Sequence, residues 1–121
     1  MCGNDNLAAH AIRALIEHRL GGKVCVVGQD ADLEACQRIV EGTQYMTVFK
    51  HIDSLAETAA EYAVMMARGE DFEAMGTVNN GKYDIPYVYV TPFAVTVDNI
   101  DEMIIDSGFH SRDEVYLNTS K

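Results

Sequence analysis

Apolar residues recur at helical spacing in three segments of the chain, and each segment predicts an amphipathic helix. In the first segment, Ala8, Ile12 and Leu15 lie three or four residues apart. Asn4 or Asp5 is placed to cap this helix, and a glycine follows each of the three segments. The predicted helices cover residues 6–20, 32–41 and 53–68.

Short runs of β-branched and aromatic residues lie between these helices and predict strands. The first run covers residues 23–28 and the second residues 45–49. Asn79-Asn80-Gly81 has the composition of a tight hairpin turn. An extended run at 87–91, a short helix at 98–106 and a turn at 111–116 complete the expected elements.

Alternating strands and helices predict an α/β fold, with a mostly parallel sheet in a three-layer α/β/α sandwich. The Asn4-Asp5 cap is of the kind that follows a strand, yet it stands almost at the first residue. We therefore expect the domain to lack a strand at its front edge and to expose an open sheet edge. Such an edge invites pairing with another chain.

The charge balance narrows the classes of partner. The chain has 121 residues, with 19 acidic against 9 basic side chains and a formal charge of −10. This excess of acid disfavours nucleic acids and anionic membrane surfaces, which basic patches bind. Residues 1–10 lack the basic and apolar parts of a signal peptide, and no apolar run is long enough to span a membrane.

The residues offer no activated nucleophile, metal site or cofactor site, so we expect no enzyme activity. The 3 cysteines and 4 histidines have no ligand spacing, and no glycine-rich phosphate loop is present. A phosphoacceptor receiver domain also places an Asp and a Lys at strand ends. That class normally needs an acidic pair ending its first strand and a proline after the lysine, whereas His51 follows Lys50.

Three polar residues stand where parallel strands should end, and they are the candidate ligand contacts. Asp30 follows the first predicted strand, Lys50 follows the second, and Asn4 precedes the first helix. Ligands of open α/β sheets bind outside the carboxyl ends of the strands. Carboxylate, ammonium and amide together supply donors and acceptors for a polyol. The alternative is that Asp30 or Asp32 only caps a helix and that Lys50 is solvated.

Several sequence stretches resemble the sugar-binding proteins of bacterial ABC importers, in their xylose-binding branch (type I periplasmic binding proteins). The resemblance covers nearly the whole chain. The stretches that carry it are Asn4-Asp5, Gly28-Gln29-Asp30-Ala31-Asp32, Met46-Thr47-Val48-Phe49-Lys50, Ile85-Pro86, Asn99-Ile100 and Gly108-Phe109.

This resemblance implies a two-lobed α/β fold, with residues 1–121 as the latter part of the second, C-terminal lobe. It implies that Asn4, Asp30 and Lys50 contact a monosaccharide such as xylose, without catalysis. The full-length protein would lie in the periplasm or be extracellular and membrane-associated, and would serve an ABC permease. A sensory module that reports sugar to a membrane kinase is the alternative.

The resemblance includes none of the family's first lobe, and two further expectations follow from this. Half of a two-lobed site cannot bury a sugar, so we expect millimolar or no affinity from this chain alone. We also expect a homodimer through the exposed sheet edge, with segment exchange through residues 87–97 as one route.

Overall fold

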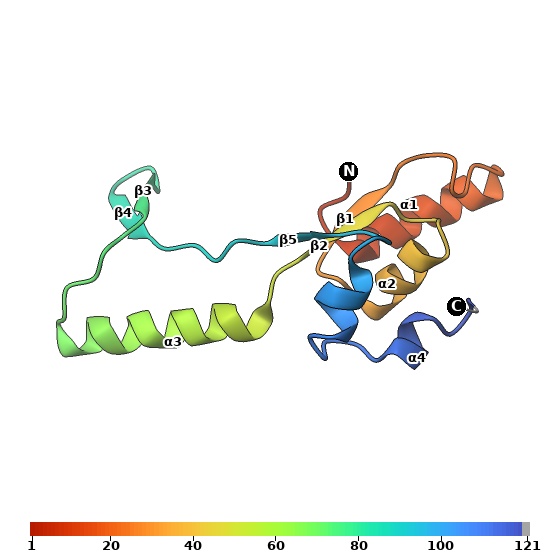
Figure 1. Cartoon of the computed structure of the whole chain (residues 1–121). Coiled ribbons are helices and arrows are strands. Elements are labelled where there is room, and N and C mark those ends of the chain that lie inside the picture. The colour runs from red at the N-terminus through yellow and green to blue at the C-terminus, as the bar shows by residue number, and fades with distance from the viewer. Residues whose placement is uncertain (120–121) are drawn as a thin grey trace. The chain divides into compact units, whose positions relative to one another are not determined.

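The computed structural model describes residues 1–119 and divides them into two compact units (Figure 1). Unit 1 comprises Met1–Phe49 together with the chain from Phe93 onward, and unit 2 comprises Lys50–Pro92. The prediction that residues 1–121 form one partial domain stays a prediction.

Unit 1 is a three-stranded sheet with helices. Its strands are β1 (Val27–Gln29), β2 (Met46–Phe49) and β5 (Phe93–Val95), in the order β1-β2-β5. β1 runs parallel to β2, whereas β5 runs antiparallel to it. The helices are α1 (Asp5–Glu17), α2 (Leu33–Val40), the π-helix η1 (Asp101–Ile105) and α4 (Arg112–Val115).

Side-chain caps fix the starts of two of these helices. The amide of Leu7 donates to Oδ1 of Asn4 over 2.9 Å, so Asn4 is the cap of α1. Ser111 and Glu114 form a reciprocal capping box at α4. Both helices therefore begin where the sequence provides a hydrogen-bonding side chain.

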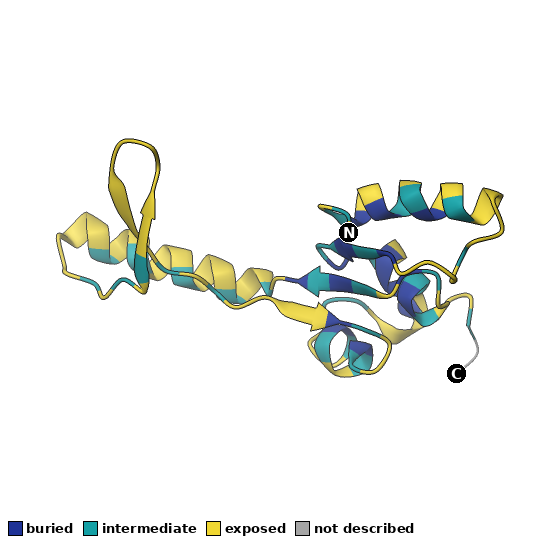
Figure 2. Ribbon diagram, turned by 90° about the horizontal axis from the view of Figure 1, so that it is seen from above, coloured by how far each residue is buried: buried dark blue, intermediate teal, exposed yellow. Residues whose placement is uncertain are grey.

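The core of unit 1 lies on one face of the sheet. Gly28, Thr47 and Val95 are in register across the three strands, and all three are buried. One core cluster joins the strands to α2, η1 and α4 through residues such as Phe49, Ile39 and Ile104. A second cluster packs α1 on the sheet through Ala8, Ile12 and Val26. Figure 2 shows these buried positions in dark blue.

Unit 2 contains one helix and a two-stranded sheet, α3 (Ile52–Arg68), β3 (Gly76–Asn79) and β4 (Asp84–Tyr87). The hairpin turn forms where Asn79-Asn80-Gly81 predicts it: the amide of Gly81 donates to Oδ1 of Asn79 over 2.8 Å. α3 has no buried residue.

The α/β class and the partial-lobe fold are confirmed, and the three long helices lie close to their predicted ranges. β1 covers Val27–Gln29 and not the predicted range 23–28, and the exposed residues Val24 and Cys25 lie outside it. The last predicted helix is a π-helical turn. Among residues 1–119, no helix has the length and hydropathy of a membrane span.

Candidate functional site

The structure places two of the three predicted contacts in unit 1. Asn4 directly precedes α1, and Asp30 directly follows β1 at its carboxyl end. Both are partly exposed, as a ligand contact requires. Lys50 follows β2 directly and is exposed, but it is the first residue of unit 2. That these three residues contact one ligand therefore stays a prediction.

The loop that carries Asp30 has an unusual backbone. Asp30 has φ of 104° and Ala31 has φ of 57°, in the left-handed region that non-glycine residues rarely adopt. Such conformations persist only where surrounding contacts impose them, and they concentrate at ligand sites.

Hydrogen bonds hold this loop at both of its left-handed residues. The amide of Asp30 donates to the carbonyl of Val48 over 2.9 Å, and the amide of Ala31 donates to Oγ1 of Thr47 over 3.1 Å. On the far side, Nε2 of His110 lies 2.9 Å from the carbonyl oxygen of Ala31. The carboxylate of Asp30 is thus presented from a fixed turn.

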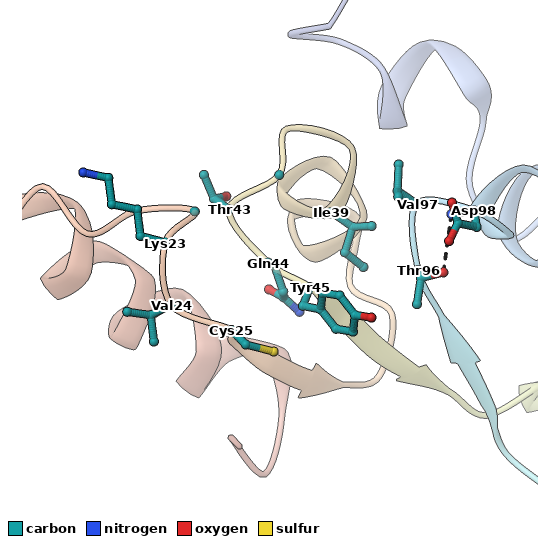
Figure 3. A pocket seen from close by; sticks show the side chains of 12 residues that line it. Lys23, Val24, Cys25, Ile39, Thr43, Gln44, Tyr45, Thr96, Val97 and Asp98 are labelled. Carbon is teal, nitrogen blue, oxygen red and sulfur yellow. Dashed lines mark hydrogen bonds between the residues drawn. The ribbon is translucent and has the colours of Figure 1, made fainter.

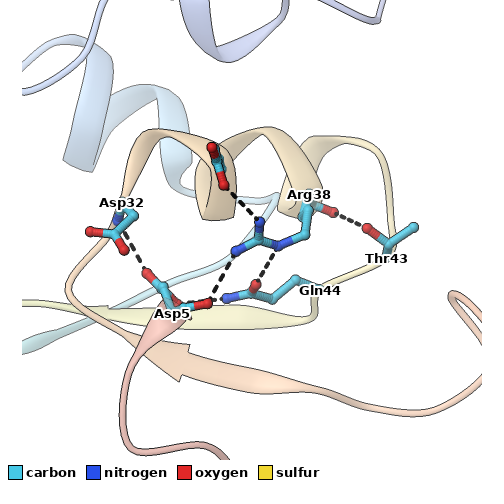
Figure 4. Close-up of polar contacts among 6 residues, drawn as sticks. Asp5, Asp32, Arg38, Thr43 and Gln44 are labelled. Carbon is cyan, nitrogen blue, oxygen red and sulfur yellow. Dashed lines mark hydrogen bonds and ion pairs between the residues drawn. The ribbon is translucent and has the colours of Figure 1, made fainter. Parts of the chain in front are cut away.

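A buried carboxylate, that of Asp5, joins α1 to this loop and to β2. Figure 4 shows its contacts with Asp32 and Gln44. Its Oδ2 accepts from the amide of Asp32 over 3.1 Å and from Oγ1 of Thr47 over 2.8 Å. Its Oδ1 accepts from Nε2 of Gln44 over 2.9 Å. We call Asp5, Asp32, Arg38, Gln44 and Thr47 the Asp5 cluster.

Arg38 and Gln44 complete the Asp5 cluster and fix its orientation. Nε of Arg38 donates to Oε1 of Gln44 over 3.0 Å, so the amide nitrogen of Gln44 must face Asp5. Nη2 of Arg38 also donates to the main-chain carbonyl of Asp5 over 3.4 Å. A side chain at position 28 would overlap the Asp5 carboxylate, which explains the glycine in β1.

Two pKa shifts describe the electrostatics around the loop. Partial desolvation raises the pKa of Asp32, and the negative charges of Asp5 and Asp30 raise it further. Burial raises the pKa of the Cys36 thiol to about 12, with Asp5 and Asp32 adding to the shift. The loop region is therefore an acidic one, and it suits hydroxyl groups or cations better than anions.

The predicted contacts differ in their hydrogen-bonding chemistry. A carboxylate such as that of Asp30 accepts hydrogen bonds, an ammonium such as that of Lys50 donates them, and an amide such as that of Asn4 has both kinds of atom. Within residues 1–119, no group of three or more His, Cys, Asp or Glu side chains is arranged to hold a metal ion. Sequence reasoning missed the buried role of Asp5, which it treated only as a possible helix cap.

A hollow lies at the amino-terminal ends of β1 and β2, opposite the end that carries Asp30 (Figure 3). This cavity has a volume of about 370 Å³. Lys23, Cys25, Tyr45 and Asp98 are among the residues that line it, and none of the predicted contacts does.

The chain matches a known protein family over more than half of its length. Residues 1–71, which include α1, the Asp5 cluster and the loop with Asp30, match the family described as "Periplasmic binding protein domain". The chain belongs to this family. Membership in a family of binding proteins also bears out the expectation that the chain is not an enzyme.

Individual relatives agree with this assignment. The "D-xylose-binding periplasmic protein" of Haemophilus influenzae is 46% identical over 116 residues, which are 96% of this chain and 35% of that protein. The chain thus spans about a third of this relative's length.

Two solved structures are similar in fold. A carbohydrate transporter solute binding protein from Chloroflexus aurantiacus, in complex with D-glucose, is 42% identical with a TM-score of 0.67, over 74% of this chain and 26% of its own. An ABC transporter solute binding protein from Clostridium phytofermentans with bound β-D-glucose is 25% identical with a TM-score of 0.78. That match covers 93% of this chain and 35% of the other.

Proposed function

We propose that this chain carries part of the sugar-binding wall of a solute-binding protein that serves an ABC importer in the periplasm. The observation that supports this most is the rigid presentation of Asp30 at the carboxyl end of β1, beside the start of α1. The similarity to proteins named for D-xylose and crystallised with glucose favours a monosaccharide as the ligand.

The proposed contacts are Asn4, Asp30 and Lys50, with D-xylose or a related pentose as the ligand. The Asp30 carboxylate would accept hydrogen bonds from sugar hydroxyls, and charge-assisted bonds of this kind are about twice as strong as neutral ones. Asn4 uses its Oδ1 to cap α1, and its Nδ2 amide supplies the donors for the ligand. Lys50 would donate from the end of β2.

Of the two outcomes expected from the sequence, millimolar affinity or none, we propose a millimolar affinity for this chain alone. Small-molecule sites normally bury about 70–90% of the ligand surface, and three polar contacts on one wall bury far less. The chain spans 35% of its Haemophilus relative, so the greater part of the relative's length has no counterpart here.

Titration calorimetry with D-xylose tests the site. We expect weak heats that fit a millimolar Kd and disappear in Asp30→Asn, which removes the charge with little change in shape. Asp98→Asn is the matched control, because Asp98 is exposed and lines the cavity at the opposite edge of the sheet. A micromolar Kd for the chain, or equal loss in both variants, would contradict the proposal.

We also propose that the chain forms a homodimer through its open sheet edge. β1 pairs with β2 on one side, and at its other edge the amide of Cys2 donates to the carbonyl of Val27 over 2.9 Å. Among the strands of residues 1–119, β1 is an edge strand, and an edge strand is a template for pairing with another chain. Light scattering should give about twice 13.4 kDa, and a monomer mass at high concentration would exclude the dimer.

A further inference from the structure

We infer that Asp5 is a positioning residue for the proposed sugar site, and that its carboxylate holds the loop from which Asp30 is presented. This inference rests on the proposed function for its biological meaning. The geometry that carries it is independent of any ligand: one buried carboxylate at the start of α1 binds two segments that are distant from it in sequence, the turn at Asp32 and the stretch that holds Gln44 and Thr47.

The loop needs an external restraint. Two consecutive non-glycine residues, Asp30 and Ala31, have positive φ, and each such conformation is unfavourable on its own. The main chain immediately after them is tied to Asp5 through the amide of Asp32. The amide of Ala31 is tied to Asp5 through Thr47, whose hydroxyl accepts from Ala31 and donates to Asp5.

The restraint requires a carboxylate and not merely a polar side chain. All three groups that face Asp5 are donors: an amide N–H, a hydroxyl and the Nε2 of Gln44. Gln44 cannot present its oxygen instead, because that oxygen accepts from Arg38 and its nitrogen also donates to the carbonyl of Met46 over 3.2 Å. An asparagine at position 5 would turn its own NH2 group either toward Nε2 of Gln44 or toward the amide of Asp32. In both cases two hydrogen-bond donors would face each other.

Asp5 also links the loop to the other proposed contact in unit 1. It follows Asn4 directly in the chain, so the main chain that carries Asn4 and the turn that carries Asp30 are anchored to the same buried group. The separation of a sugar-facing amide and a sugar-facing carboxylate is thereby set by Asp5, which need not touch the sugar.

Asp5→Asn in the full chain tests the inference by NMR, with Asp98→Asn as the matched control. We expect the NMR scalar couplings of Asp30 and Ala31 to show that their φ angles are no longer positive. We also expect the amide hydrogen of Asp32 to exchange with solvent at least about tenfold faster. The control should change neither. Retention of both features in Asp5→Asn would overturn the inference.

A second pair of variants keeps the test decisive if Asp5→Asn does not fold. Thr47→Val removes the hydroxyl that bridges Asp5 and Ala31 at nearly constant shape, whereas Thr47→Ser keeps it. Thr47→Val should shift the Ala31 coupling and speed its amide exchange, and Thr47→Ser should restore wild-type values. Equal behaviour of the two would show that side-chain packing, not the Asp5 cluster, holds the loop.

The two proposals fail in different ways. Addition of D-xylose to the wild-type chain should shift the signals of Asn4 and Asp30, and Asp5→Asn should weaken these shifts although it leaves both residues in place. If the wild-type chain shows no such shifts, the proposed sugar site is wrong. The φ couplings and the Asp32 amide would still decide the role of Asp5.

Discussion

Replacing Gly28 by alanine should damage unit 1 severely, although it adds one methyl group. Gly28 is buried in β1 and lies in register with Thr47 of β2. A Cβ at this position would overlap Oδ1 of Asp5 and would lie 3.1 Å from Nε2 of Gln44. The Asp5 carboxylate is fully buried, so it cannot move aside without losing its partners.

The size of the effect follows from two terms. Overpacking of a buried position costs about 1–3 kcal/mol. Displacement of the carboxylate removes the acceptor of the buried Thr47 hydroxyl and of one N–H of the buried Gln44 side chain, at about 1–3 kcal/mol for each group. We therefore expect Gly28→Ala to lower the free energy of unfolding by about 3 kcal/mol or more, a large share of the total for a small domain.

Urea unfolding followed by circular dichroism measures this loss. Gly3→Ala is the matched control, because nothing lies within 4 Å of a Cβ built at Gly3. It should shift the stability by less than about 0.5 kcal/mol. Asp5→Ala should lower the free energy of unfolding by less in the Gly28→Ala background than in the wild-type chain. In that background Asp5→Ala also removes the carboxylate that overlaps the new methyl group.

Two results would refute this reasoning. A loss below about 1 kcal/mol for Gly28→Ala would mean that β1 and Asp5 are not packed as described. Strict additivity of Gly28→Ala and Asp5→Ala would mean that the two positions do not interact.

Three other predictions concern unit 1. Because burial raises the pKa of Cys36 to about 12, its thiol should resist alkylation at neutral pH while exposed Cys25 reacts. The unfolded chain releases that proton at a lower pH than the folded chain, so stability should fall above about pH 9, by up to about 1.4 kcal/mol per pH unit. The Ser111 hydroxyl lowers the pKa of Glu114 by hydrogen bonding to its carboxylate, so Ser111→Ala should raise that pKa. An NMR titration of the Glu114 carboxyl group measures the change. Asn4→Ala should cost about 1 kcal/mol in urea unfolding through loss of the α1 cap, whereas Asn4→Ser should cost less.

Local sequence signals predicted the helices well because helix ends depend on nearby residues. The cap at Asn4 and the glycine at the end of α3 are visible in the sequence, and the structure uses both. Strand lengths depend on distant partners. Val24 and Cys25 look like strand residues, yet they are exposed and stand outside β1, because a residue joins a ladder only where a neighbouring strand lies beside it.

The candidate site was only partly visible in the sequence for the same reason. Strand-end positions identified Asn4, Asp30 and Lys50 as candidates. The role of Asp5 depends on Gln44 and Thr47, which lie 39 and 42 residues away in the sequence. No local sequence pattern predicts contacts at such a separation. In retrospect, a glycine inside a strand was the available signal, since it often marks a close approach by another group.

One measurement tests most directly whether Asn4, Asp30 and Lys50 contact a pentose, as we propose. Isotope-labelled chain is titrated with D-xylose and followed residue by residue by NMR. We predict shifts concentrated at these three residues and the Asp30–Asp32 turn, with a millimolar Kd. Shifts centred on the cavity beside Tyr45, or none at high sugar concentration, would contradict it.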